Sequence, residues 1–360
     1  MVDPLHVGVI GCGYWGSKHV RVLSMLPGVR VSLIDPDDEK RAALTGSYPV
    51  DRTVSDLDEI ADDLDAVVVA TPPSTHYAIA RRAIEADLHV LVEKPMTTDV
   101  DDAVELVRLA EARDRRLMVG HTFEFNPAVW SLAEVTRAPD FGRVRYINSA
   151  RLNLGLYQRD TNVIWDLAPH DLSILNYILD AQPSSISVWG LHLMSDQSDV
   201  AYLSLRYDEQ DVSACIHVSW LDPMKVRRTT VVGENSMAVY DDVATEERLR
   251  VYDKGVDANA GSHDPGHPLT YRNGAIVSPF IDFKEPLQLE LSAFIDSIRT
   301  GATPPVDGRR GLDVVVALCA AEESLRRGGQ WVDIASSEDL MSTIVVDEPL
   351  TAESITEAAL

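Results

Sequence analysis

The first third of the chain alternates short apolar runs with longer runs of helical period. The apolar runs are rich in Val, Ile and Leu, which is typical of parallel strands covered on both faces. Strands that alternate with helices in this way indicate an α/β domain with a doubly wound parallel sheet, the Rossmann arrangement. The predicted strands are His6–Ile10, Val29–Ile34, Ala66–Ala70, His89–Val92 and Arg116–Val119, and the predicted helices are Ser17–Leu26, Thr75–Ala86 and Asp99–Ala112.

The pattern changes at about Phe123, where several runs alternate apolar and polar residues one by one. Such alternation is typical of antiparallel strands with one covered face. A stretch rich in Gly, Asp, His and Asn, Asp253–Gly274, predicts a loop. The predicted strands are Val144–Ala150, Ile186–Leu193, Ala201–Tyr207, Asp211–Trp220 and Lys225–Val232, and the predicted helices are Asp166–Leu179, Pro286–Arg299 and Arg310–Arg327.

These patterns predict two domains and a tail. Residues 1–122 are expected to form the Rossmann domain. Residues 123–335 are expected to form an α+β domain for substrate binding and oligomerisation, with a large, mostly antiparallel open sheet. No basic residue follows Arg327, so we expect residues 336–360 to be an acidic, partly ordered tail.

The composition narrows the range of partners. The 360 residues include 32 basic and 57 acidic side chains, which gives a net charge of −25. Such a surface repels phosphate backbones and anionic lipids, so we expect neither a nucleic-acid nor a membrane partner. Cys12, Cys215 and Cys319 are too widely spaced for a disulfide framework or a zinc-ligand pair. The N-terminus has no basic segment and only a short apolar run, so we expect a cytoplasmic protein.

A glycine-rich turn, Gly11-Cys12-Gly13-Tyr14-Trp15-Gly16, follows the first predicted strand and opens a helix. Gly11 allows the tight turn, Gly13 lets the backbone approach a pyrophosphate, and Gly16 lets helix and strand pack closely. Asp35 ends the second strand, where a carboxylate binds ribose hydroxyls and repels the 2′-phosphate of NADP. The sequence therefore predicts NAD as the cofactor rather than NADP. A helix-packing turn without a nucleotide is the alternative.

Two further segments lie at the carboxyl ends of predicted strands, where open α/β sheets bind their ligands. Thr71, Pro72 and His76 follow one strand and are candidate cofactor contacts, in a segment that also suits a helix-starting proline turn. Glu93 and Lys94 end the next strand. The ammonium group of Lys94 is a candidate donor to a substrate hydroxyl, where it would stabilise alkoxide character; a surface charge is the alternative.

Asp166 and His170 are four residues apart and share one face of a predicted helix. Histidine suits proton transfer from a sugar hydroxyl, and a carboxylate one turn away can orient it or bind a neighbouring hydroxyl. A structural hydrogen-bonded pair is the alternative. Metal ligation by these residues with Asp171, or by His263 and His267 in the predicted loop, is disfavoured, so we expect no metal.

Taken in order, the glycine turn, Glu93-Lys94-Pro95 and Asp166-x-x-x-His170 resemble the glucose–fructose oxidoreductase/inositol dehydrogenase (Gfo/Idh/MocA) family, over roughly residues 5–335. The resemblance implies an N-terminal NAD(P) domain and a C-terminal α/β domain whose open sheet packs against another subunit. A homodimer or homotetramer is therefore expected. The family implies Lys94 and His170 as catalytic residues, with Asp166 beside them.

Two details of the resemblance concern the neighbourhood of the site. Ala168 stands where the family motif usually has Gly, a small change that still permits close approach. Gly120–Pro127 matches the segment that links the two domains in the family. The match implies that Phe123 and Asn126 lie near cofactor and substrate.

Within the family, Trp165–Asp171, Met237–Asp242 and Glu285–Leu287 resemble members of nucleotide-sugar and amino-sugar pathways. That resemblance implies oxidation of the C3 hydroxyl of a UDP- or dTDP-hexose, whose ketone an aminotransferase then uses. The same chemistry on inositol or another free polyol stays open, as does reduction of a ketosugar. A cofactor-binding regulator without turnover is a third hypothesis, and the presence of Lys94 and His170 argues against it.

The candidate site residues fall into two groups. Those expected at the cofactor are Gly11, Gly13, Tyr14, Trp15, Gly16, Asp35, Thr71, Pro72, His76, Glu93, Lys94 and Asn126. Those expected at the substrate are Lys94, Phe123, Arg151, Asn153, Tyr157, Asn162, Asp166 and His170.

Overall fold

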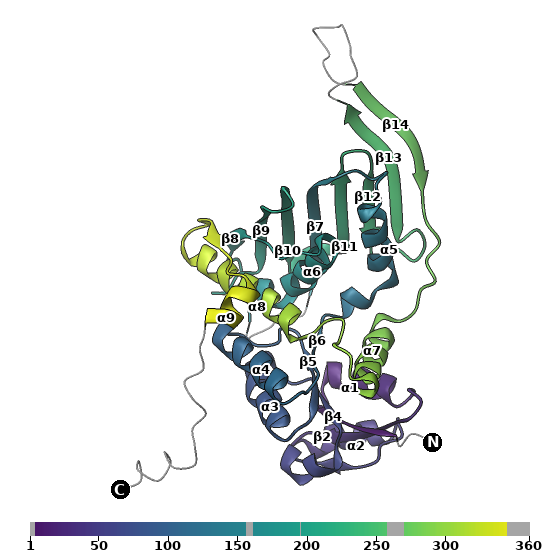
Figure 1. Cartoon of the computed structure of the whole chain (residues 1–360), viewed down its shortest axis with the longest axis vertical. Helices are drawn as coiled ribbons and strands as arrows, with labels where there is room; N and C mark the ends of the chain where they lie inside the picture. The colour runs from purple at the N-terminus through teal and green to yellow at the C-terminus, as the bar shows by residue number, and fades with distance from the viewer. Residues whose placement is uncertain (1–3, 156–160, 195, 258–269, 344–360) are drawn as a thin grey trace.

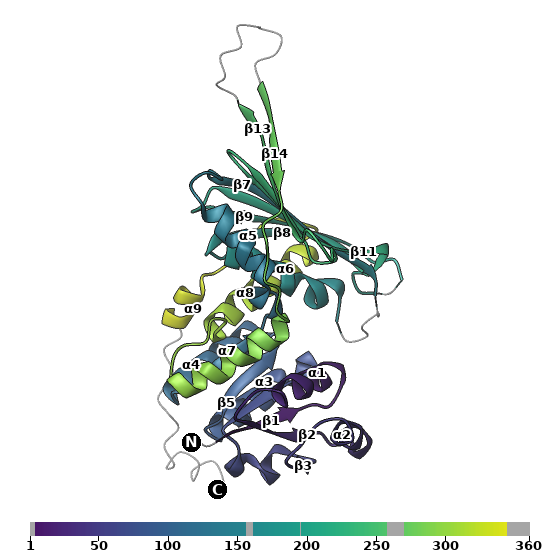
Figure 2. The same cartoon turned by 90° about the vertical axis from the view of Figure 1, so that its right-hand side faces the viewer.

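The computed structural model describes residues 4–155, 161–194, 196–257 and 270–343. The chain forms two bodies, each built on one sheet, and they lie one above the other (Figures 1 and 2). Among these described residues, no helix is both long and apolar enough to cross a membrane.

The lower body is a parallel sheet with the strand order β3-β2-β1-β4-β5-β6. The order reverses direction between β1 and β4, which makes a crevice at the carboxyl ends of these two neighbours. The doubly wound sheet is thus confirmed. Its strands are β1 (Leu5–Ile10), β2 (Val29–Ile34), β3 (Thr53–Val54), β4 (Ala66–Val69), β5 (His89–Glu93) and β6 (Leu117–Gly120), and its helices are α1 (Tyr14–Leu23), α2 (Asp38–Thr45), α3 (Pro73–Glu85) and α4 (Val100–Ala112).

Two of these elements, α2 and β3, were not predicted. Helix α2 buries only Leu44, so its sequence carries almost no apolar period. It begins instead at an N-cap, since the Asp37 side chain accepts hydrogen bonds from the N–H groups of Glu39 and Lys40. Strand β3 has two residues, too few for a pattern to be read. Two short 3₁₀ turns, Leu57–Glu59 and Ala61–Asp63, complete the crossover to β4.

The upper body is a nine-stranded sheet with the order β14-β13-β12-β11-β7-β10-β9-β8-β15. Only β7 and β10 pair in parallel, so the sheet is mostly antiparallel, as predicted. The strands are β7 (Val144–Leu154), β8 (Ser185–Leu191), β9 (Val200–Tyr207), β10 (Val212–Ser219), β11 (Leu221–Gly233), β12 (Met237–Asp241), β13 (Leu249–Asp257), β14 (Thr270–Val277) and β15 (Val332–Asp333).

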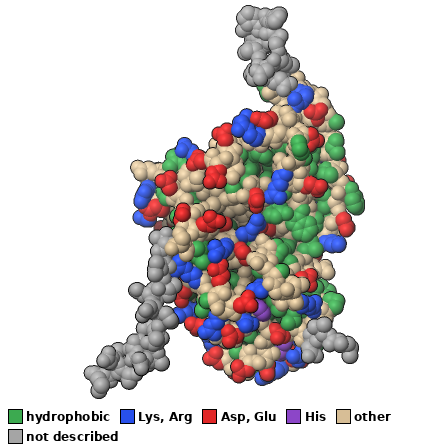
Figure 3. Space-filling view, viewed as in Figure 1, with side chains coloured by type: hydrophobic (Ala, Val, Ile, Leu, Met, Phe, Trp, Pro, Cys, Tyr) green, Lys and Arg blue, Asp and Glu red, His purple; other side chains and the backbone are tan. Residues whose placement is uncertain are grey.

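The predicted loop at Asp253–Gly274 is wrong at both ends. Strand β13 continues to Asp257 and β14 starts at Thr270, and the two form a hairpin that projects from the edge of the sheet (Figure 1). A projecting hairpin has no covered face to demand apolar residues, and an ion pair between Arg272 and Asp253 joins its strands. Figure 3 shows hydrophobic side chains gathered on this side of the upper body. The exposed large hydrophobic residues on β14 and just after it are Tyr271, Ile276, Val277 and Phe280.

Helices cover one face of the upper sheet and fill the space between the bodies (Figure 2). Helix α6 packs on β7, β9 and β10, while α8 contacts α4 and β6 below and β8 above. These helices are α5 (Pro127–Arg137), α6 (Val163–Leu179) and α8 (Gly308–Arg326); a 3₁₀ turn, η3 (Thr122–Phe125), precedes α5, and α9 (Ser337–Thr343) packs on α4 and α8.

Helix α7 (Pro286–Thr300) corrects the linear division of the chain. The division predicted from the sequence assigned it to the second domain, but it packs against α1 in the lower body. Leu287, Leu291 and Phe294 share a buried cluster with Val7 and Val20. Their spacing places them on one helical face, which the lower body covers.

A buried ion pair fixes α6 on β7. The guanidinium of Arg151 on β7 donates to Asp171 on α6 over 2.6 Å, and both side chains are almost fully buried. The hydroxyl of Ser149 donates a further hydrogen bond to Asp171 over 2.7 Å. A buried pair tolerates its desolvation only when hydrogen bonds satisfy the remaining lone pairs. The pair therefore fixes the position and rotation of the helix that carries Asp166 and His170.

Asp171→Ala is expected to lower the free energy of unfolding by about 3–5 kcal/mol, because Arg151 is left buried without a counter-charge. Arg30→Ala, which breaks an exposed ion pair with Asp51, is the control and is expected to cost about 1 kcal/mol or less. Urea unfolding measures both variants. Similar losses of unfolding free energy in the two variants would contradict the role of the buried pair in fixing α6 on β7.

Candidate active site

The glycine-rich turn crosses from β1 to α1 at the crevice. Gly11 has a φ of +93°, and a Cβ there would lie 2.6 Å from the carbonyl oxygen of Ala70. A Cβ on Gly16 would lie 1.8 Å from the carbonyl oxygen of Gly11. Gly13 differs, because no described heavy atom outside Gly13 and its two neighbours in the chain lies within 4 Å of its ideal Cβ position. The chain's own packing therefore requires Gly11 and Gly16, whereas Gly13 leaves open space at a helix start, where an anionic pyrophosphate fits.

Asp35 lies against this turn at the end of β2. Its carboxylate accepts the backbone N–H of Cys12 over 2.7 Å and that of Asp37 over 2.9 Å. Burial, followed by the charge of Asp35, raises the pKa of the Cys12 thiol to about 12, so this thiol stays protonated. No arginine directly follows Asp35 in the sequence, but Arg41 donates to the Asp35 carbonyl oxygen and pairs with Asp38.

The aromatic pair that follows Gly13 is exposed. Tyr14 is 73% exposed and Trp15 41% exposed, and their rings meet edge to face with centroids 5.6 Å apart. Both are in the first turn of α1. They follow Gly13 directly in the chain, and their contact with the cofactor stays a prediction.

His76 joins the loops that follow β4 and β5. Its Nδ1 lies 2.8 Å from the carbonyl oxygen of Pro95, and its Nε2 lies 2.8 Å from that of Thr71. Burial lowers the pKa of His76, so its imidazole is neutral and donates to one of these carbonyls at a time. Pro72 is the N-cap residue of α3, and Thr71 accepts a hydrogen bond from the Thr75 hydroxyl. His76 thus shapes the crevice wall through two backbone carbonyls.

Lys94 and Asp166 meet where the two bodies face each other. The Lys94 Nζ donates to the backbone carbonyl of Asp166 over 2.7 Å and lies 3.6 Å from the Asp166 carboxylate. The other carboxylate oxygen of Asp166 accepts the indole N–H of Trp220 over 2.9 Å. Residues 72 apart in sequence are thereby brought into contact, on the carboxyl end of β5 and the first turn of α6.

His170 lies one helical turn beyond Asp166. Its ring is half-buried and meets the ring of Phe123 edge to face, with centroids 5.1 Å apart. Its Nδ1 is buried and has no hydrogen-bond partner among the described residues. Burial, and then the positive charges of Lys94 and Arg151, hold the pKa of His170 well below 6.5. The imidazole is therefore neutral at neutral pH, which is the form that accepts a proton.

Two other candidates, Arg151 and Asn126, have polar atoms bound within the protein. Arg151 forms the buried pair with Asp171, although its Nη1 has no partner among the described residues. Asn126 donates to the hydroxyl of Tyr240 over 2.9 Å and accepts the N–H of Ala128. These bonds make Arg151 and Asn126 supports of the site, and they do not favour direct contacts with substrate or cofactor.

The remaining substrate candidates are Asn162, Asn153 and Tyr157. Asn162 is its N-cap, accepting the N–H groups of Ile164 and Trp165, and also donates to Glu322. These bonds occupy its side chain and do not favour the predicted substrate contact. Asn153 is half-buried near the end of β7. Tyr157 lies outside the described residues, as do His263 and His267.

The structure adds residues that the sequence analysis did not select. Arg227 and Arg151 lie over the face of the Phe123 ring, 5.6 Å and 4.4 Å from its centroid. Arg227 also pairs with Asp242 over 3.1 Å, and Tyr240 donates to the same carboxylate. Tyr240 and Asp242 fall within a segment noted only for its resemblance. No sequence signal distinguishes Arg227 from Arg228, its neighbour on the same strand.

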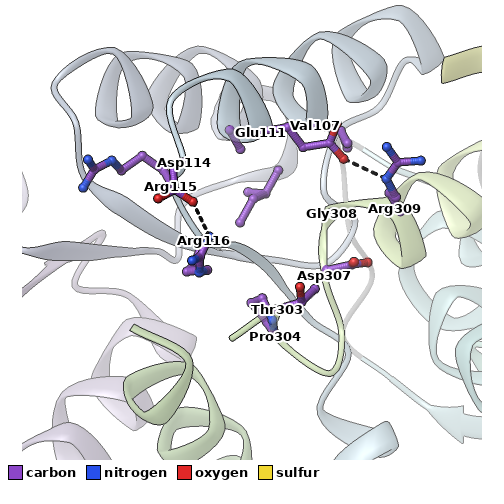
Figure 4. A pocket seen from close by; sticks show the side chains of 12 residues that line it. Val107, Glu111, Asp114, Arg115, Arg116, Thr303, Pro304, Asp307, Gly308 and Arg309 are labelled. Atoms are coloured by element: carbon purple, nitrogen blue, oxygen red, sulfur yellow. Dashed lines mark hydrogen bonds and ion pairs between the residues drawn. The ribbon is translucent and has the colours of Figure 1, made fainter. Parts of the chain in front are cut away.

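A hollow of about 320 Å³ lies away from these residues, between α4, the start of β6 and the start of α8 (Figure 4). Its charged side chains pair with one another, Arg309 with Glu111 and Arg116 with Asp114. It gathers none of the predicted site residues. Among the residues that the structure describes, no group of three or more His, Cys, Asp or Glu side chains is placed to hold a metal ion.

Sequence comparisons agree with this geometry. Residues 5–121 match the model of an oxidoreductase family with an NAD-binding Rossmann fold, and residues 130–239 match the GFO/IDH/MocA C-terminal domain. The UDP-N-acetylglucosamine 3-dehydrogenase of Acidithiobacillus ferrooxidans is 28% identical over 327 residues, or 89% of this chain and 98% of that protein. An inositol 2-dehydrogenase of Mycolicibacterium smegmatis is 30% identical over 358 residues, or 94% of this chain and 98% of that protein.

Solved structures show the same fold. A crystal form of the Acidithiobacillus ferrooxidans UDP-N-acetylglucosamine 3-dehydrogenase has a TM-score of 0.76 at 24% identity, and the match covers 92% of this chain and all of that one. An oxidoreductase from Kribbella flavida has a TM-score of 0.78 at 19% identity, and the match covers 93% of this chain and 100% of that one.

Gly13→Ala and Gly16→Ala are expected to separate cofactor binding from stability. The Gly16 substitution places a Cβ against a backbone oxygen and is expected to cost about 3 kcal/mol of unfolding free energy. The Gly13 substitution meets open space and is expected to cost about 1 kcal/mol or less, while NAD binds at least about 10-fold more weakly. Urea unfolding and fluorescence titration with NAD measure the two effects. Unchanged NAD affinity in Gly13→Ala would rule out the turn as the pyrophosphate site.

Proposed function

Since the chain belongs to the GFO/IDH/MocA family of oxidoreductases and has its NAD-binding Rossmann domain, we propose that it oxidises a secondary hydroxyl of a sugar. One observation carries the proposal: the Lys94 ammonium lies 2.7 Å from the first turn of the helix that presents His170. A hydrogen-bond donor and a neutral base are then available to one hydroxyl group.

The described residues fit a dinucleotide. The open space at Gly13 and the free N–H groups at the start of α1 suit the pyrophosphate. Asp35, 7% exposed beside the turn, suits the adenosine ribose. Its carboxylate disfavours a 2′-phosphate, and Arg41 is already paired with Asp38, so NAD is preferred over NADP. When bound, NAD supplies the carbon that accepts the hydride.

The protein's own groups divide the work at the reacting hydroxyl. Neutral His170 accepts the hydroxyl proton, and the Lys94 ammonium donates a hydrogen bond to the oxygen as negative charge develops on it. Asp166 holds Lys94 in place and is itself fixed by Trp220. Loss of one proton to the imidazole, together with loss of one hydride, would convert the alcohol to a ketone, and NAD would take up the hydride when bound. In the opposite direction, imidazolium returns the proton to a ketosugar.

For the substrate we favour C3 of a UDP- or dTDP-hexose, in a sequence that leads to an amino sugar. The support is the likeness to a relative that is a UDP-N-acetylglucosamine 3-dehydrogenase. Inositol or another free polyol is the second candidate, favoured by the likeness to an inositol 2-dehydrogenase. Reduction of a ketosugar uses the same residues in reverse. A regulator without turnover is disfavoured, because Lys94 contacts Asp166 and His170 lies one helical turn further along the same helix.

The open face of the upper sheet suits pairing with a second copy of the chain, as a dimer or tetramer. Trp189, Tyr202 and Tyr146 are 56%, 43% and 38% exposed. The Tyr202 ring stacks on His217, with centroids 4.1 Å apart. Exposed aromatic side chains in one place are typical of protein interfaces. The net charge of −25 argues against a nucleic-acid partner.

Reduction of NAD with UDP-glucose, UDP-N-acetylglucosamine, dTDP-hexoses and inositol tests the function. A UDP- or dTDP-hexose is expected to give the highest kcat/KM. Lys94→Ala is expected to lower kcat roughly 10²- to 10⁴-fold, with the Kd for NAD within about threefold of its original value. Equal losses of turnover and of NAD binding would contradict the role of Lys94. Failure of every sugar in both directions would favour a regulator.

The protonation of His170 predicts the acid side of the pH profile. Because its pKa lies well below 6.5, the imidazole keeps its base form as the pH falls to 6.5. For oxidation, the acid limb of kcat/KM is therefore expected below pH 6.5 and is expected to disappear in His170→Asn. Initial rates from about pH 5 to about pH 9 measure it. An acid limb centred above pH 6.5 would contradict the assignment of His170 as the base.

A further inference from the structure

Four ionisable side chains lie buried behind Lys94, and the proposed reaction uses none of them directly. They come from four elements: His19 from α1, Glu93 from β5, His121 after β6 and Glu290 from α7. His19 and Glu290 are 0% exposed, His121 is 1% exposed and Glu93 is 6% exposed. Buried ionisable groups are costly, so their gathering at one place calls for a physical account.

The geometry links this cluster to Lys94 through Glu93. The Nε2 of His19 lies 2.8 Å from one Glu93 oxygen, and because a carboxylate only accepts, His19 donates here. The other oxygen accepts the backbone N–H of Lys94 over 3.2 Å. Strands β5 and β6 align Glu93 with Gly120, so Lys94 and His121 are the next residues along two neighbouring parallel strands.

Only one of the two buried acids is charged. Burial works against the charge of Glu93, but the hydrogen bond from His19 and the nearby charge of Lys94 bring its pKa below the ordinary value. Burial, and then the charge of Glu93, raise the pKa of Glu290 well above its ordinary value. Burial, and then Lys94, lower the pKa of His121 to about 4. The cluster therefore presents one carboxylate, Glu93, to Lys94.

We propose that His19 and Glu93 form a buried positioning pair, in which His19 orients the Glu93 carboxylate, and Glu93 holds the Lys94 backbone and places a negative charge near its ammonium group. Because His19 is on α1, the pair couples the helix that begins at the glycine turn to the group that polarises the substrate. The inference rests on the role proposed for Lys94. Neither His19 nor Glu93 is required to touch substrate or cofactor.

The charged and titratable groups around the pair come from each packed element. Glu93 faces His19 on α1, His76 on α3, Glu290 on α7 and its neighbour Lys94. Lys94 also faces His121 and, across the crevice, Asp166 and His170. Glu93 and Asp166 both bring carboxylate charge near the Lys94 ammonium. Removal of the Glu93 charge leaves the Asp166 carboxylate to offset the ammonium charge.

Three variants of the full-length protein test the pair. Glu93→Gln removes the charge and keeps the shape. His19→Leu removes the donor, whereas His19→Gln keeps an N–H group at about the position of Nε2. His6→Leu is the matched control, since His6 is also buried in the lower sheet, where it bonds Ser32 and the Asp63 carbonyl away from Lys94.

The first readout needs neither substrate nor turnover. The chain has six lysines, and ¹³Cε-labelled lysine gives one titrating NMR signal for each, with Lys94 assigned by its loss in Lys94→Arg. In Glu93→Gln the midpoint of the Lys94 signal is expected to fall by roughly one pH unit or more, because the ammonium loses a neighbouring negative charge. His19→Leu is expected to move it in the same direction, and His19→Gln to restore it.

The second readout is the alkaline limb of kcat/KM for whichever sugar is turned over. It is expected to move to lower pH in Glu93→Gln and His19→Leu, with kcat roughly 10- to 100-fold lower, and to stay in place in His6→Leu.

An unmoved Lys94 signal in both Glu93→Gln and His19→Leu overturns the inference, as does an equal movement in His6→Leu. If no sugar is oxidised, the NMR titration still decides on the pair, so failure of the proposed function is seen separately. If Glu93→Gln does not fold, the His19 variants and the control give the answer alone.

Discussion

The contact between the Lys94 ammonium and the backbone carbonyl of Asp166 is the interaction on which the site depends. It joins the end of β5 in the lower body to the start of α6, which belongs to the upper one. Through it, a side chain from one sheet reaches the helix that presents His170. The crevice of an open α/β sheet is the usual place for a ligand. This contact brings the hydrogen-bond donor, Lys94, to the helix that carries the proposed base, His170.

Several buried polar contacts fix the position of Lys94 relative to Asp166 and helix α6. The pair between Arg151 and Asp171 fixes α6 on its sheet, and Trp220 fixes the carboxylate of Asp166. A buried charge pair contributes little net stability, because desolvation offsets its attraction, yet it strongly disfavours any arrangement that leaves one partner alone. The same reasoning applies to Glu93 behind Lys94. Apolar side chains at these positions would stabilise the fold at least as well. The buried polar side chains instead fix the geometry of the site, as is common in active sites.

Much of the fold and part of the site could be predicted from local sequence. The apolar runs predicted the five longer strands of the lower sheet. Because the glycine turn directly follows one of them, it could be interpreted as a dinucleotide-binding turn. The family, the α/β fold, the oxidoreductase class and NAD as cofactor are all confirmed. Lys94, Asp166 and His170 were selected by position and resemblance, and the structure brings them together, although their roles stay predictions. Contacts between residues far apart in the sequence could not be predicted. Local sequence does not show that Arg151 pairs with Asp171 or that Asn126 bonds Tyr240. Nor does it show that α7 packs against the lower body.

The most direct test is a crystal structure of the protein with NAD and a non-oxidised substrate analogue. We predict that the nicotinamide ring lies in the crevice and that the analogue's oxygen lies within about 3–3.5 Å of both the Lys94 Nζ and a ring nitrogen of His170. A complex in which these two groups approach different parts of the ligand, or in which NAD binds away from Gly13, would contradict the account.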